Sequence, residues 1–452
     1  MSHHTSNDDG LSAILAAVGE PSSRALATAV ESLIRDGVLP AGQRLATVRR
    51  VAEALNVSPA TVSVAWTELR RAGWLHTDRR RGTVVALTFV DDVRPWSQYP
   101  LDEYLPDPQL LPPLEAAFAA AAAGRRADHD TDAVEPALLD AVTATWPYAP
   151  AAFTVANGGY EGTLLALRAT VRPGGAVAVE QPTAPRILDT LRAVRAVAIP
   201  VQGDAEGPLP DALQEALFRR PDVFLYQPRS QVPSGTTVSH RRIEELASVL
   251  ERAPSPVTVI EDDNIGPASS LPARSLGGVH PDRHVLIRSY CKAFGVDIRT
   301  CVISGPAEVV SRIDRIRTLG MLATSRLLQG ALAHLLADEV TGRHLLIARR
   351  RHRDRRRALA AALRQHGLDV PGDGDGLALW VPVDDESHAH EQLSRLEVTV
   401  GSGAACRIQA PHASHVWVGT GSLPDEPMRI SELAALLADA AAVPETGITT
   451  VG

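Results

Sequence analysis

The sequence predicts an α/β protein with a small, mainly helical N-terminal domain, a large domain built on a sheet, and a smaller C-terminal α+β lobe. Three observations predict this architecture. The chain has 452 residues, too many for one ordinary hydrophobic core. Residues 11–88 show helical periodicity that ends in a short pair of strands. From about residue 105 onward, apolar strand-like runs alternate with amphipathic helical stretches.

Composition along the chain predicts the domain boundaries. Residues 89–104 contain two prolines, mixed charge and no clear period, so we interpret them as a linker. We therefore expect one domain at residues 11–88 and a second at residues 105–452. In the second domain, a helical stretch at residues 327–366 precedes a mixture of strands and helices. This change places the smaller lobe at about residues 330–445.

Five short apolar runs are the strand candidates of the large domain. They are AVAVEQ (176–181), VFLYQP (223–228), VTVIED (257–262), VLIRSY (285–290) and CVISG (301–305). Helical stretches lie between most of them, which predicts a doubly wound α/β sheet.

Composition also limits the class of protein. Hydrophobic residues make up 45% and charged residues 22%, as in soluble globular proteins, and the net charge of −8 excludes a globally basic nucleic-acid binder. No apolar run reaches the length of a membrane span, and the polar N-terminus lacks the apolar stretch of a secretory signal. Three cysteines without a CxxC pair argue against a disulfide framework or a zinc site. We therefore expect a cytoplasmic protein without a structural metal.

Positive charge is concentrated in the N-terminal part of the chain. Residues 1–90 hold ten arginines and eight acidic residues, a balance of +2 in a chain whose total is −8. Residues 44–81 alone hold eight arginines and three acidic residues. This asymmetry indicates an anion-binding module.

Residues 37–85 have the pattern of a winged helix-turn-helix. Thr47 is suited to N-cap a helix that runs to about Leu55, and Asn56 begins a tight turn. Ser58 is suited to N-cap a second helix, because a proline follows it at the first helical position. The hairpin predicted next has three arginines at its tip and reads as a wing.

This pattern suits DNA, because small polar side chains at the start of the second helix can enter a major groove while arginines reach phosphates. A protein-interaction module with a solvated charged face is the alternative. The expected DNA contacts are Arg49, Ser58, Ala60, Thr61, Ser63, Arg70, Arg79, Arg80 and Arg81.

Lys292 is the single lysine among 45 lysines and arginines, so 44 positive residues are arginine. Arginine can replace lysine as a charge, but its delocalised guanidinium cannot form a Schiff base. The lysine therefore indicates a chemical role for its amine. Chance survival, or a packed site that suits a compact ammonium, is the alternative.

The sequence around Lys292 predicts a site for a phosphorylated ring. Lys292 follows a predicted strand, at the carboxyl end where open α/β sheets bind ligands. The glycine turn in NGGYEGTLLAL (157–167) opens a helix whose free N–H groups can bind a phosphate. A carboxylate at the end of the strand VTVIEDD can pair with a protonated ring nitrogen. Taken alone, those acids can equally cap a helix.

Both parts of the chain resemble known families. The N-terminal part resembles the GntR-type winged helix. The matching positions are Leu45, Arg49, Ala52, Leu55, Val57, Ser58, Thr61, Val62, Ala65, Trp66 and Leu69. QPRSQVPSG (227–235), VIEDDN (259–264) and SYCKAFGVDIR (289–299) resemble pyridoxal-phosphate enzymes of the aspartate aminotransferase fold, fold type I. The two together resemble the MocR family of bacterial transcription regulators.

The resemblance implies a role for individual residues. It makes Lys292 the lysine that forms a Schiff base with pyridoxal 5′-phosphate. Asp262 would face the ring nitrogen and Gln231 the ring hydroxyl. Ser289, Arg299 and the backbone around Gly158, Gly159 and Tyr160 would hold the phosphate. Arg186 falls where one family member has an arginine for an effector carboxylate.

Several positions depart from the family pattern. Asn264 replaces a tyrosine that touches the ring oxygen, and Ala184 replaces an aromatic residue that stacks on the ring. Ser230 replaces a histidine. Trp417 replaces the arginine that grips the substrate carboxylate, and His129 stands where a tyrosine of the second subunit would come. Cofactor binding is expected to be weakened, and standard transamination is not expected.

The expected function is therefore that of a homodimeric transcription regulator that binds double-stranded promoter DNA. Its aminotransferase-like domain would bind pyridoxal phosphate, or an adduct of it, as a small-molecule effector. Two alternatives stay open: an active aminotransferase with a DNA-binding head, and a regulator whose large domain no longer binds the cofactor.

Overall fold

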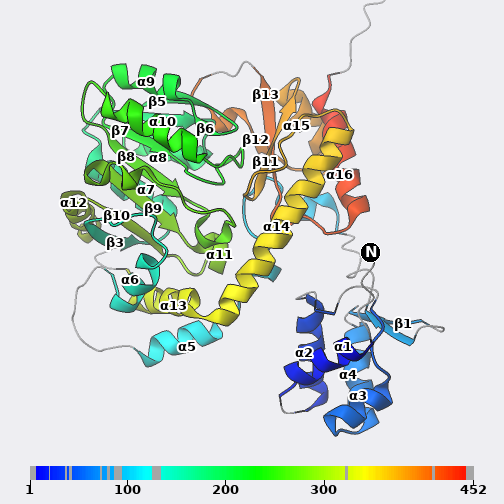
Figure 1. The fold of residues 1–452 in the computed structure, drawn as a ribbon. Coiled ribbons are helices and arrows are strands. Elements are labelled where there is room, and N and C mark those ends of the chain that lie inside the picture. Colours follow the sequence, from blue (N-terminus) through cyan, green and yellow to red (C-terminus); the bar gives the residue numbers. More distant parts are fainter. Residues whose placement is uncertain are drawn as a thin grey trace, which may run out of the picture. The chain divides into compact units, whose positions relative to one another are not determined.

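The computed structural model divides the chain into two compact units, Met1–Arg94 and Pro95–Gly452. Each unit is described by itself (Figure 1). The residues that the structure describes are 7–19, 21–35, 38–39, 43–71, 74–78, 82–85, 94–124, 134–320, 324–409 and 413–443.

The first unit consists of helices followed by a hairpin. Its elements are α1 (Asn7–Ala17), α2 (Ser23–Arg35), α3 (Val48–Leu55), α4 (Pro59–Arg71), β1 (Leu75–Asp78) and the antiparallel β2 (Gly82–Val85). The Thr47 hydroxyl accepts a hydrogen bond from Arg50 N and caps α3, and Asn56 ends α3 in the left-handed conformation. Trp66 is fully buried among apolar residues of all four helices. The helix starts and the turn predicted from Thr47, Asn56 and Ser58 are confirmed.

The large lobe of the second unit is built on an eight-stranded sheet. The strands lie in the order β3-β10-β9-β8-β7-β4-β5-β6. Their bounds are β3 Ala152–Ala156, β4 Ala176–Gln181, β5 Val197–Asp204, β6 Gly207–Pro208, β7 Val223–Tyr226, β8 Thr258–Asp263, β9 His284–Ser289 and β10 Cys301–Gly305. The strands β9, β8, β7, β4 and β5 are parallel, whereas β10 runs antiparallel to both its neighbours. All five predicted strands are present, and the sheet is mixed rather than wholly parallel.

Helices cover both faces of this sheet (Figure 1). One face packs against α7 (Gly159–Thr170), α8 (Pro185–Ala193) and α12 (Ala307–Thr318). The other face packs against α9 (Pro210–Phe218), α10 (His240–Glu251), α5 (Glu115–Ala123), α6 (Pro136–Thr143) and α13 (Arg326–Ala337). Because both faces are covered, the parallel strands are continuous apolar runs. A short helix, α11 (Cys291–Phe294), follows β9.

The small lobe contains a three-stranded antiparallel sheet in the order β11-β13-β12. Its strands are β11 (Ala378–Val383), β12 (Gly401–Ser402) and β13 (Ser414–Gly419), with α15 (Glu386–Arg395) and α16 (Pro427–Ala441) beside them. The long helix α14 (Glu339–Gln365) runs from α13 to this sheet (Figure 1). Leu345 belongs to the core of the large lobe and Leu359 to that of the small lobe. Only the second half of α14 therefore contributes to the core of the small lobe. The small lobe was expected to begin near residue 330, so this contribution begins later in the chain than expected.

Residues 95–104, the part of the expected linker that lies in the second unit, are packed against the small lobe. Trp96, Tyr99 and Leu101 are buried in its core, because aromatic and aliphatic side chains gain more from burial there than from exposure in a linker. These residues therefore belong to the second unit.

Helix α14 is also less solvated than its nine arginines suggest. Arg355 and Arg356 are buried, and Arg355 bonds to Asp107 at 2.8 Å and to Asp425 at 2.8 Å. Arg355 therefore joins α14 to the 105–110 segment and to the loop before α16. Arg356 donates to Ser234 O of the large lobe and to Ala378 O of the small lobe, so it joins the two lobes. Across the described ranges, no helix is long and apolar enough to cross a membrane.

Candidate functional site

The candidate site lies at the carboxyl ends of β4, β7, β8 and β9. Parallel strands bring these ends to one edge of the sheet, so residues far apart in sequence meet there. Asp262 is the last but one residue of β8, Ser289 ends β9, and Gln227 follows β7. Lys292 lies three residues after β9, in α11. The strand order therefore brings Asp262, Ser289 and Lys292 together at the carboxyl edge of the sheet.

Lys292 is buried, with 7% of its surface exposed. Burial lowers the pKa of its amine, because the charged form loses hydration. Its Nζ donates a hydrogen bond to Asn264 Oδ1 and lies 4.7 Å from the centre of the Tyr104 ring. The amine is thus held between a polar and an aromatic neighbour, and its depressed pKa enlarges the fraction that is neutral and nucleophilic.

Asp262 is buried beside the lysine. Burial raises the pKa of its carboxyl to about 6, and a hydrogen bond from Gln227 and the charge of Lys292 oppose that rise. Gln227 Nε2 donates to Asp262 Oδ2 at 2.8 Å, and Gln227 Oε1 accepts from Val232 N at 2.8 Å. Gln227 therefore fixes the orientation of the carboxylate. The sequence prediction did not include Gln227, and its position directly after a buried strand is the signal that indicates it.

The glycine turn before α7 lies against Ser289 and Arg299. Gly158 has φ +93°, and a Cβ atom there would lie 3.3 Å from Arg299 Cζ. A Cβ atom on Gly159 would lie 3.3 Å from Ser289 Cβ. Only glycines allow this close approach with this backbone. The turn therefore presents the first N–H groups of α7 next to a hydroxyl and a guanidinium, which is a combination that binds phosphate.

Two tyrosines and a tryptophan form one wall of the site. The hydroxyls of Tyr104 and Tyr160 are hydrogen-bonded to each other. The Tyr104 ring lies 5.6 Å from that of Trp417, between ring centres. Arg186 lies over the Tyr160 ring, with Cζ 5.2 Å from its centre. Tyr104 was not predicted from the sequence, because it belongs to the segment interpreted as a linker.

Among the described residues, no hydrogen bond joins Lys292 to three other predicted positions, Gln231, Ser230 and Ala184. Gln231 Nε2 donates to Pro182 O at 2.5 Å, and its Oε1 accepts from Ser234. Ser230 is buried with φ +49°. Ala184 is buried at the N-cap of α8. His129 lies outside the described residues.

The donor set fits pyridoxal phosphate, the cofactor expected from the sequence. The site combines an amine, a carboxylate that can pair with a ring nitrogen, and a glycine cradle for phosphate. In the part of the chain that the structure describes, the buried side-chain donors of this region without a hydrogen-bond partner include Asn264 Nδ2, Asn157 Nδ2 and Trp417 Nε1. Buried polar atoms are seldom left unpaired, so these donors indicate room for a polar ligand's acceptors.

The candidate DNA contacts lie on α3 and α4 of the first unit. Ser58 Oγ accepts from Thr61 N at 3.1 Å and is 2.9 Å from Thr61 Oγ1, so both hydroxyls lie at the start of α4. Ala60 and Ser63 are exposed on that helix. Arg49 is exposed on α3, and the exposed Arg70 donates to Thr67 Oγ1 at 2.9 Å. Arg79, Arg80 and Arg81 lie outside the described residues.

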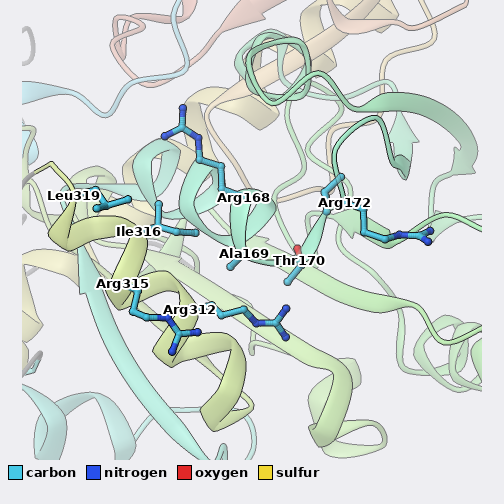
Figure 2. A pocket seen from close by; sticks show the side chains of 9 residues that line it. Arg168, Ala169, Thr170, Arg172, Arg312, Arg315, Ile316 and Leu319 are labelled. Carbon is cyan, nitrogen blue, oxygen red and sulfur yellow. The ribbon is translucent and has the colours of Figure 1, made fainter.

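A separate hollow of about 380 Å³ lies between α7 and α12 and is lined by four arginines (Figure 2). Their guanidinium groups extend in different directions. Arg172 pairs with Asp222 at 2.5 Å and Arg312 with Glu308 at 3.2 Å. Arg168 and Arg315 lie in the last turns of their helices, where cations complement the helix dipole. The cluster is therefore explained by local charge balance.

Two family models match the chain. The model of aminotransferase class I and II matches residues 106–423, and that of bacterial regulatory proteins of the gntR family matches residues 22–85. The first match covers the candidate cofactor site, and the second covers α2 through β2.

Individual relatives resemble the whole chain. The vitamin B6 salvage pathway transcriptional repressor PtsJ of Salmonella typhimurium is 31% identical, over 89% of this chain and 94% of its own. The pyridoxine biosynthesis transcriptional regulator PdxR of Corynebacterium glutamicum is 24% identical, over 87% and 88%. The crystal structure of the multiple substrate aminotransferase from Thermococcus profundus has a TM-score of 0.68 at 18% identity, over 75% of this chain and 90% of its own. At that identity, the structural likeness concerns the fold alone.

Proposed function

The chain belongs to the MocR subfamily of GntR-type transcription regulators, and from that premise we propose that its aminotransferase-like unit binds pyridoxal phosphate as an effector. Binding there would control how the winged helix engages promoter DNA. The observation that carries the proposal is the buried Lys292 beside Asp262 and the glycine turn at one edge of the sheet. The names of two relatives, a vitamin B6 salvage repressor and a pyridoxine biosynthesis regulator, also support it.

Each residue of the site would have a distinct part in holding the cofactor. The cofactor supplies an aldehyde, which condenses reversibly with a primary amine, and Lys292 carries that amine. Its lowered pKa favours the neutral form that reacts. Asp262, oriented by Gln227, would keep the ring nitrogen protonated. Asn264 Nδ2, buried and without a partner among the described residues, would donate to the ring oxygen.

The phosphate would lie against the N-terminus of α7. The N–H groups after Gly158 and the Ser289 hydroxyl would donate to it, and Arg299 would supply the charge. Arginine and helix N–H groups together neutralise a dianion better than either does alone. The structure has Gln231 bonded to Pro182 and Ser234, so a contact from Gln231 to the ring would require its side chain to turn.

Transcription control follows from linkage between the two units. A ligand changes DNA affinity only when it has different affinities for the DNA-competent and incompetent arrangements. We propose a homodimer, so that two winged helices read two half-sites. Ser58, Ala60, Thr61 and Ser63 would face the major groove, and Arg49 would lie near a phosphate.

Turnover of amino acids is not favoured by the same geometry. Trp417, a buried apolar ring, occupies the β13 position at which the resemblance has a substrate-binding arginine. Losing one charge-assisted hydrogen bond costs roughly 1.5–3 kcal/mol of binding. An aminotransferase-like domain used for sensing does not need that contact.

Absorption spectroscopy of the full-length protein tests cofactor binding. Pyridoxal phosphate should produce a visible imine band that borohydride traps on Lys292. Lys292→Ala and Lys292→Arg should both lack it, since arginine keeps the charge but not the reactive amine. A wild-type spectrum identical to that of free pyridoxal phosphate would exclude the effector assignment.

DNA binding is measured on a fragment from upstream of the protein's own gene. We expect salt-sensitive binding by a dimer, changed by pyridoxal phosphate at least about fivefold in the wild type and unchanged in Lys292→Ala. A monomer that binds all DNA equally would contradict the regulatory part of the proposal.

A further inference from the structure

Tyr104 occupies the space next to the reactive amine. Its ring centre is 4.7 Å from Lys292 Nζ, and Asn264 Oδ1 accepts the amine's hydrogen bond. Any second amine that exchanges with Lys292 must bring its α-carbon within a few ångströms of the same atom. The Tyr104 ring fills part of the volume that this exchange needs.

The backbone beneath Tyr104 is anchored on both sides. Gly419 N donates to Leu101 O at 2.7 Å. A Cβ atom on Gly419 would clash with Glu103 O, and one on Gly421 would clash with Leu105 O. Asp107 pairs with Arg355 at 2.8 Å. The segment therefore lies in close contact with the end of β13, and the position of the Tyr104 ring is built into the fold.

Tyr160 and Trp417, the two aromatic side chains beside Tyr104, carry no charge that could bind an amino-acid carboxylate. Burial raises the pKa of Tyr104 to about 12, and burial together with Tyr104 raises that of Tyr160, so both phenols stay neutral at physiological pH. Trp417, whose ring centre is 5.6 Å from that of Tyr104, is uncharged. Arg186 contacts the face of Tyr160. Consecutive contacts therefore lead from Lys292 through the two tyrosines to this cation.

We propose that Tyr104 restricts the site to pyridoxal phosphate itself, by filling the space in which the α-carbon and carboxylate of an amino acid would have to lie. This inference rests on the proposed binding of pyridoxal phosphate. It makes the effector the free cofactor, bound through Lys292, rather than an adduct of the cofactor with an amino acid. Tyr104 is a specificity-determining residue, and its neutral ring excludes amino acids by volume and by the absence of charge.

Wild-type protein loaded with pyridoxal phosphate provides the first test. L-alanine, L-glutamate and γ-aminobutyrate are added separately, and samples are reduced with borohydride over time to measure the fraction of cofactor fixed to Lys292. An amine that exchanges with Lys292 forms an imine of its own, so reduction then releases the cofactor from the protein together with that amine. We expect the fraction fixed to Lys292, and the DNA affinity of the loaded protein, to stay the same with each amine. Rapid loss of that fraction in the wild type would overturn the inference and leave cofactor binding intact.

Variants at position 104 provide the second test. Tyr104→Ala should allow the added amino acid to displace the cofactor from Lys292 at a rate higher by roughly tenfold or more, since the blocked volume is opened. Tyr104→Phe retains the ring and should restore the slow rate. Asp102→Ala, at an exposed position of the same segment, is the matched control and should react like the wild type. Equal rates in wild type and Tyr104→Ala would exclude a role for the ring.

The two hypotheses fail in different ways. If neither the wild type nor Tyr104→Ala forms an imine band, the proposed cofactor binding is wrong and the inference falls with it. If both form the band and both exchange quickly, only the assignment of Tyr104 is wrong.

Discussion

Asp262 and Asp263 are neighbouring carboxylates on β8 with opposite surroundings, and Asp263→Asn tests what the second of them does. Asp263 is fully buried and accepts hydrogen bonds from Arg229 Nε at 2.8 Å, Arg229 Nη2 at 2.9 Å and Arg288 Nε at 2.7 Å. Both guanidinium groups are buried as well. The carboxylate therefore neutralises two cations that have little contact with water.

The expected loss of stability is large. Removing one partner of a buried ion pair costs about 3–5 kcal/mol, because an uncompensated charge remains in the interior. We expect the free energy of unfolding of the second unit to fall by that amount in Asp263→Asn. Burial alone would raise the pKa of Asp263, but Arg229 and Arg288 outweigh it and hold the pKa well below its usual value. The stabilisation is thus present at neutral pH and is lost as the pH falls below about 3.9 toward the folded-state pKa.

Urea unfolding of the full-length protein, followed by circular dichroism and tryptophan fluorescence, measures this loss. Asp189→Asn is the matched control, because the ion pair of Asp189 with Arg192 is exposed and contributes little. A loss below about 1 kcal/mol for Asp263→Asn would refute the view that this carboxylate compensates two buried charges.

Three further predictions concern the cofactor site and the winged helix. Burial raises the pKa of Asp262 to about 6, so the cost of ionising this carboxyl in the folded protein lowers the stability of the wild type as the pH rises from about 4 to 6. Over that range, the free energy of unfolding of Asp262→Asn should rise by up to about 3 kcal/mol relative to wild type. Urea titrations at several pH values measure this difference, and a difference that does not change with pH would contradict the prediction. Gly158→Ala should weaken pyridoxal phosphate binding about tenfold in an absorbance titration, because φ is +93° and the new Cβ would lie 3.3 Å from Arg299 Cζ. Gly174→Ala is the control: its φ is +72°, but open space surrounds it, so this variant should bind the cofactor normally. Thr47→Ala removes the N-cap of α3, in which Thr47 Oγ1 accepts a hydrogen bond from Arg50 N at 3.4 Å. The stability of the winged helix should fall by about 1 kcal/mol, and its thermal transition should move to a lower temperature. An unchanged transition would show that the cap contributes nothing.

Local patterns predicted much of the fold. The strands 176–181 and 301–305 have the bounds expected from their apolar runs, and the others differ by one or two residues at an end. Thr47 and Asn56 mark the ends of α3, because capping and left-handed turns are properties of a few neighbouring residues. β3 was not predicted, since AFTVA is short and its partner β10 lies far away in sequence.

The site was predicted in part for a similar reason. Lys292, Asp262, Ser289 and the glycine turn each follow or precede a recognisable element, so strand topology brings them together. Gln227 and Tyr104 were not expected. Their importance comes from contacts with Asp262 and Lys292 that only long-range packing creates.

The sequence by itself determined the chemistry available to this protein: one primary amine among 44 arginines, a carboxylate at the end of a strand, a glycine turn before a helix, and a helix-turn-helix pattern. These are properties of residue type and short spacing, and they can be read without coordinates. The tertiary structure decided which side chains border the amine. Residues 89–104 look like a linker because they have no period. Trp96, Tyr99 and Leu101 nevertheless gain burial in the small lobe, and that packing places Tyr104 beside Lys292. A contact between residues 188 positions apart depends on how the lobes pack, which no local pattern encodes.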